Sequence, residues 1–355
     1  MTKCNVLVTI QERERCGAGF LILLPCALLL SLAAPAVGQT RERTGSATGP
    51  SILKLHASTR AHALGSAFWP GSGHAVFHHP ALISSQGFDL SVGGVSHRDG
   101  DGDRDHDSRD RDVGRHHPDD ALYTALSVAA NWMGGSVSLG LAVLDYGYSL
   151  DIDTRRERDL TPAERARLVA AARLRRTSTE FVGVVGYTRE AVFGIDVGAA
   201  AKVVGQSAGG YGGRAGALDL GMSRDFGRVT AALTVQNLGP DLELAGREVP
   251  LPRRLVLGAG TRGRAPAGPL DIGATAQVSY ERGGEIVPGG GVEIAYWPIQ
   301  RRVFIVRVGG IRVVEGDGLP VTFGAGFEGD RIRVDYGYSE RDPVVGPHRI
   351  GVSIR

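Results

Sequence analysis

Histidine is the residue type here with the most obvious capacity for chemistry, because its imidazole can bind a metal or act as a general base. Nine of the ten histidines fall between His56 and His117, and His74, His78 and His79 form the densest group. No carboxylate or cysteine stands beside this group at the spacing that metal sites use. We therefore expect no metal there.

Other signatures of chemistry are also missing from the sequence. The aspartate-rich run at 97–112 lacks the EF-hand glycine and the late glutamate that a calcium loop needs. We find no nucleophile elbow, phosphate-binding loop or zinc-binding pair. Lysine and arginine total 40 against 38 acidic residues, so charge gives no basis for a nucleic-acid partner. We predict that the protein is not an enzyme and has no catalytic residue, cofactor or metal.

Strand-like alternation dominates the rest of the chain. In residues 330–339 (DRIRVDYGYS), Ile332 and Val334 share one face and Arg333 and Asp335 share the other, since strand side chains alternate. In a soluble sandwich the apolar face would pack against a core and the charges would meet water. In an outer-membrane barrel the apolar face meets lipid and the charges line a lumen.

The lengths of the connections favour the barrel. About fourteen segments alternate in this way, each near the length of a tilted bilayer-spanning strand. Long connections at 97–120, 149–177, 205–213 and 239–251 are each followed by a short one, such as 133–135. Long external loops and short periplasmic turns are typical of outer-membrane barrels. The sequence predicts an all-β fold, a closed antiparallel transmembrane β-barrel of about 14 strands.

The N-terminus resembles an export signal. Residues 17–37 are nearly all apolar, follow a basic region and end in small residues before Gln39. A permanent membrane anchor is the alternative. We predict a cleaved signal peptide over 1–38, an N-terminal segment over 39–85, the barrel over 86–355, and the outer membrane of a diderm bacterium as location. All three cysteines lie in the leader, so the mature chain would have no disulfide.

Charged residues on the faces opposite the apolar ones are candidates to line the lumen. The predicted lumen-lining residues are Asp196, Lys202, Asp219, Arg307, Arg333 and Asp335.

Residues 55–83 (LHASTRAHALGSAFWPGSGHAVFHHPALI) carry a family likeness. They resemble the N-terminal signature of the PorV/PorQ family of FadL-like outer-membrane barrels, an Ala-Arg-Ala run followed by a Phe-Tyr-Asn-Pro-Ala-Gly-Leu motif. His79 stands where that motif has asparagine, and the glycine is missing. The stretches 194–204, 218–239 and 321–355 extend the resemblance over essentially the whole mature chain. The matching residues are Arg60, Ala61, Gly65 and Ala67 in the first part, and Phe77, Pro80, Ala81 and Leu82 in the second.

The resemblance implies a fourteen-stranded barrel whose N-terminal segment plugs the lumen. It makes Phe77, His79, Pro80, Ala81 and Leu82 the plug or gate motif. Family members admit hydrophobic small molecules or serve a secretion machine, so the expected partners are outer-membrane lipid and either hydrophobic compounds or secretion-machinery proteins. A channel, a secretion-associated barrel for exported proteins and a structural envelope barrel with no transport role remain as alternatives.

Overall fold

The structure is a computed structural model, and it describes residues 49–70, 73–83, 87–96, 120–146, 161–164, 167, 178–190, 192–208, 211–299, 301–312, 320–339 and 348–355. The predicted signal peptide and almost all of the loops at 97–120 and 149–177 lie outside these residues. No helix in the described part of the chain is long and apolar enough to cross a bilayer.

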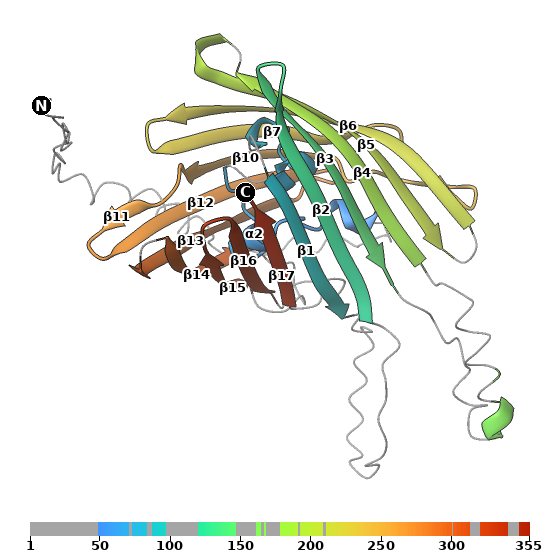
Figure 1. The fold of residues 1–355 in the computed structure, drawn as a ribbon. Helices are drawn as coiled ribbons and strands as arrows, with labels where there is room; N and C mark the ends of the chain where they lie inside the picture. The colour runs from blue at the N-terminus through green and yellow to red at the C-terminus, as the bar shows by residue number, and fades with distance from the viewer. Residues whose placement is uncertain are drawn as a thin grey trace, which may run out of the picture. The chain divides into compact units, whose positions relative to one another are not determined.

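Fourteen antiparallel strands close into a ring (Figure 1). Each strand pairs with the next along the chain, β1 pairs with β17, and β10 pairs with β12 to bridge the short strand β11. This confirms the predicted barrel. The ring strands are β1 (Gly87–Ser96), β2 (Asp120–Trp132), β3 (Gly135–Asp145), β4 (Ser178–Glu190), β5 (Ile195–Ala208), β6 (Tyr211–Phe226), β7 (Val229–Leu238), β10 (Arg254–Thr261), β12 (Leu270–Glu281), β13 (Ile286–Ile299), β14 (Arg302–Ile311), β15 (Val321–Glu328), β16 (Ile332–Ser339) and β17 (His348–Ile354).

The outward face of the ring is apolar and the inward face is polar. In β16, Ile332 and Val334 are exposed whereas Arg333 and Asp335 are buried, which confirms the predicted alternation. An apolar belt exposed on a closed barrel is the surface that lipid covers. The belt includes Leu122, Leu126, Leu139, Leu141, Val185, Val203, Leu218, Leu220, Met222, Leu257, Val292, Ile294, Val306, Phe323 and Ile350.

Two predicted long connections have a different structure. The glycine-rich stretch 205–213 is not a long loop. The pairing of β5 with β6 continues through it, from the pair Gly205 and Arg214 to the pair Ala208 and Tyr211. Backbone pairing needs no side chain, so a glycine-rich sequence can continue a hairpin. The stretch 239–251 contains a second hairpin, β8 (Leu242–Leu244) and β9 (Arg247–Val249), paired with each other alone.

The apolar belt predicts how much a charged substitution would destabilise the barrel. Leu220 lies midway along the outward face of β6 and is half exposed. Leu220→Arg should destabilise the barrel by about 2–4 kcal/mol, because a charge would lie near the bilayer midplane. Phe226→Arg at the end of the same strand should cost about 0–1 kcal/mol. Urea unfolding in lipid vesicles measures both, and equal costs would contradict a lipid-facing belt.

Candidate functional site

Residues 49–70 and 73–83 lie in the interior of the ring and form four short helical turns (Figure 1). These are η1 (Ser51–Leu53), α2 (Thr59–Ala63), η2 (Gly73–Phe77) and η3 (Pro80–Leu82). The Ser58 side chain caps α2 by accepting a hydrogen bond from the Ala61 amide. Gly65 then reverses the chain at φ 67°, and a Cβ there would lie 2.1 Å from the Gly310 carbonyl oxygen. Only glycine tolerates both this positive φ and this close approach of the two backbones.

This segment contacts every strand of the ring. Twelve strands form a hydrogen bond with it, and β14 and β16 approach it through Gly309 and Gly337. The wall residues that form these bonds are Asp89, Ser127, Ser138, Glu180, Lys202, Ser223, Gln236, Arg254, Thr275, Glu293, Thr322 and Arg349, one from each of the twelve strands.

The half of the interior lined by β2 to β6 contains a large apolar cluster. Alanine and valine side chains and Leu144 of these strands pack there against Ile52, Leu53 and Phe77, beside buried polar residues such as Glu180. The β8–β9 hairpin adds Leu242, which is fully buried in the same cluster. A cavity lined by Ile52, Phe77, Tyr123 and Val182 in this half has a volume of about 10 Å³. The wall residues of this apolar cluster include Ala121, Ala125, Ala142, Leu144, Val182, Val184, Ala200, Val204, Ala215 and Ala217.

A buried lysine links the segment to the wall in this half. Lys202 Nζ lies 2.6 Å from an Asp219 carboxylate oxygen and donates hydrogen bonds to the Phe77 carbonyl and to Asn237 Oδ1. Asn237 adopts φ 57°, and its amide nitrogens bind Asp219 and the Pro252 carbonyl. The two predicted lumen residues Lys202 and Asp219 therefore form one ion pair that also fixes the turn after β7.

The other half of the interior holds a network of charges that we call the Glu293 cluster. It consists of Arg60, Arg264, Arg307, Arg333, Glu293, Glu328 and Asp335.

Glu293 lies at the centre of this cluster, and its side chain is fully buried. Arg60 of α2 donates two hydrogen bonds to it, at 2.8 and 2.7 Å, and also lies 3.8 Å over the ring of Trp69. Arg307 and Arg264 bind the same carboxylate at 2.7 and 2.5 Å. A buried charge is tolerated only with such partners.

The structure brings together three of the six predicted lumen residues, Arg307, Arg333 and Asp335, in the Glu293 cluster. Asp196 lies apart from them and is half-buried. Glu293 is not among the predicted lumen-lining residues, although the alternation of Val292, Glu293 and Ile294 in the sequence places it on a polar face. The five residues of the predicted gate motif, Phe77, His79, Pro80, Ala81 and Leu82, are all buried. Their role as a gate stays a prediction.

Burial lowers the pKa of three interior histidines, His74, His78 and His79, below the ordinary value of this side chain. Burial lowers the pKa of His79 to about 4. Burial also lowers the pKa of His74 to about 4, although the nearby Asp89 carboxylate opposes the shift. Among the described residues, no group of three or more histidine, cysteine, aspartate or glutamate side chains is arranged to hold a metal.

Comparison with known proteins finds likeness at the level of fold. No family model matches the sequence, and no curated protein is similar to it. A mutant of the monoaromatic hydrocarbon channel TodX superposes with a TM-score of 0.48 at 12% identity, covering 84% of this chain and 96% of that one.

Two further solved structures show the same level of likeness. The P. putida toluene transporter TodX gives a TM-score of 0.46 at 11% identity, covering 82% and 95% of the two chains. The monoaromatic hydrocarbon channel CymD gives 0.47 at 12%, covering 85% and 97%. These TM-scores lie below 0.5, so the likeness carries no functional argument, and the PorV/PorQ resemblance stays a prediction.

Proposed function

We propose that this chain is an outer-membrane β-barrel of PorV/FadL-like type that admits hydrophobic small molecules past residues 49–83. The observation that carries the proposal is the apolar cluster on the inner wall of β2 to β6. A pore for polar solutes keeps a polar, water-filled wall. The wall of β2 to β6 instead presents side chains such as Ala142, Val182 and Val204, which suit an apolar solute.

Passage requires the segment to move, because the void beside it is smaller than any organic solute. The charges of the wall are arranged for such a movement. Arg264 and Arg307 also bind Glu293, at 2.5 and 2.7 Å, so withdrawal of Arg60 would not leave this buried carboxylate unpaired.

A structural envelope barrel is the second candidate. The observation in its favour is the same segment, which contacts all fourteen strands and fills the interior between them. A segment held by so many wall residues could serve only to brace the barrel. The secretion-associated role has no comparable observation and stays a prediction from the resemblance.

A disulfide lock separates the two candidates. A Cβ at Gly221 of β6 would lie 3.4 Å from the Cβ of Ala81 in η3, close to the spacing that a disulfide requires. Ala81→Cys combined with Gly221→Cys should tie η3 to the wall when oxidised. Uptake of a radiolabelled monoaromatic hydrocarbon by cells that express the barrel should fall on oxidation and recover on reduction.

The two single-cysteine variants are the matched controls, and the same redox treatment should leave their uptake unchanged. Uptake that is equal in the oxidised and reduced double variant would show that the segment need not move. Uptake by the wild-type barrel no higher than in cells without it would favour the structural candidate.

A further inference from the structure

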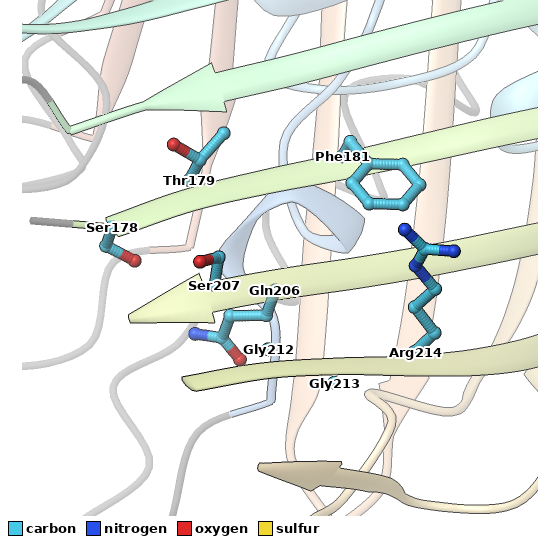
Figure 2. Close-up of a pocket in the computed structure, with 8 residues that line it drawn as sticks. All are labelled: Ser178, Thr179, Phe181, Gln206, Ser207, Gly212, Gly213 and Arg214. Atoms are coloured by element: carbon cyan, nitrogen blue, oxygen red, sulfur yellow. The ribbon is translucent and has the colours of Figure 1, made fainter. Parts of the chain in front are cut away.

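A pocket of about 550 Å³ opens where β4, β5 and β6 approach the end of the barrel that carries the predicted external loops (Figure 2). Phe181, Ser207 and Arg214 belong to the outward face, because they share the parity of the exposed Val203 and Leu218. The Arg214 side of the pocket therefore lies outside the ring, whereas Ser178, Gln206 and Gly213 have the opposite parity and line it from the inward face. Its lining residues are Ser178, Thr179, Phe181, Gln206, Ser207, Gly212, Gly213 and Arg214.

The pattern along β6 fixes the depth of this pocket in the membrane. Leu218, Leu220 and Met222 lie outward between the exposed residues Arg214 and Arg224. Ten residues of strand span about 33 Å. At the usual strand tilt this corresponds to about 25 Å along the bilayer normal, the height of a barrel's apolar band. Arg214 therefore lies at the headgroup level of the external leaflet, and Arg224 at that of the other leaflet.

The chemistry of the pocket suits an anion. The Arg214 guanidinium lies 5.8 Å from the centre of the Phe181 ring, and no carboxylate within the described part of the chain pairs with it. Thr179 and Ser207 add hydroxyl donors. Arginine is the side chain that best matches a phosphate, through two parallel hydrogen bonds.

Two glycines leave space in this pocket. A Cβ at Gly205 would lie 2.1 Å from the Phe181 ring, so this ring lies flat over the bare backbone. At Gly212 no atom lies within 4 Å of the place a Cβ would take. The outward surface is thus hollowed beside Arg214, whereas Val203 and Leu218 begin the apolar belt immediately below it.

We propose that this pocket binds the phosphate-bearing headgroup of a lipid of the external leaflet. The phosphate binds Arg214 and the nearby hydroxyls, and the acyl chains follow the apolar belt past Val203 and Leu218. The inference rests on the outer-membrane location in the proposed function, but it does not depend on transport.

Lipid binding to the purified full-length barrel in detergent tests the proposal, with native mass spectrometry as the readout. The probes are phosphorylated lipid A, the same lipid with its phosphates removed, and inorganic phosphate. Arg214→Ala should weaken binding of phosphorylated lipid A at least about tenfold, the effect of one charged hydrogen bond. Arg224→Ala is the matched control, because Arg224 lies on the same strand and face, 5.3 Å from the Phe226 ring. It should change binding less than twofold.

Three results would overturn the proposal: equal weakening by Arg214→Ala and Arg224→Ala, equal affinity for the two forms of lipid A, and full competition by inorganic phosphate at the lipid's concentration. The last would assign the pocket to a free anion. If oxidation of the double cysteine variant leaves uptake unchanged while Arg214→Ala weakens lipid binding, the proposed transport role is wrong and the lipid site stands.

Discussion

Glu293→Gln should destabilise the barrel by about 3–5 kcal/mol, the usual cost of removing one partner from a buried ion pair. The substitution keeps the shape of the side chain and removes its charge. Arg60, Arg264 and Arg307 would then share the two remaining carboxylates of the Glu293 cluster with Arg333. Because the Arg307 and Glu293 side chains are both fully buried, water cannot replace the lost partner. Urea unfolding in lipid vesicles measures the free-energy change.

A surface ion pair provides the control. Asp241→Asn removes a carboxylate that binds the partly exposed Arg282 at 2.8 Å in the connections between strands, and it should leave the free energy of unfolding nearly unchanged. Combining Glu293→Gln with Arg60→Met should recover part of the stability, because it removes one charge of each sign. A cost for Glu293→Gln as small as that of Asp241→Asn would show that the cluster is not buried as described.

Gly198→Leu should detach η3 from the wall without unfolding the barrel. A Cβ at Gly198 of β5 would lie 2.4 Å from both the Ala81 amide nitrogen and the Pro80 carbonyl carbon, so any larger side chain displaces this backbone. Overpacking of this kind costs about 1–3 kcal/mol or more. Each 1.4 kcal/mol raises the population of the detached state about tenfold. Chymotrypsin cleavage after Phe77, which is buried three residues before η3, should therefore accelerate about tenfold or more.

The matched control is Gly183→Leu on β4. Gly183 faces outward, and no atom lies within 4 Å of the place its Cβ would take. This variant adds the same side chain to the lipid-facing surface and should leave the cleavage rate unchanged. Both variants should keep the heat-modifiable gel migration of a folded barrel. Unchanged cleavage in Gly198→Leu would mean that η3 does not rest on Gly198.

Alternation along single strands predicted much of this structure. It separated Ile332 and Val334 from Arg333 and Asp335, and the same rule placed Lys202 and Asp219 on the inward face. It failed where side chains are lacking: the glycine-rich stretch 205–213 was predicted to be a loop because glycine has no face to alternate. The sequence also shows that Arg214 and Arg224 flank the apolar outward residues of β6. This becomes informative about membrane depth only once β6 is known to begin at Tyr211.

The sequence by itself determined which side chains of each strand share a face, because alternation is a local property of the extended backbone. Only the tertiary structure decided which of those side chains meet. Arg60 and Glu293 are 233 residues apart and pair because α2 packs inside the ring against β14 to β17, within reach of the Glu293 side chain of β13. The apolar cluster of β2 to β6 and the Glu293 cluster arise in the same way, because the order of the strands around the ring brings their side chains together. Such long-range neighbours depend on closure and register, which no local pattern of residues specifies.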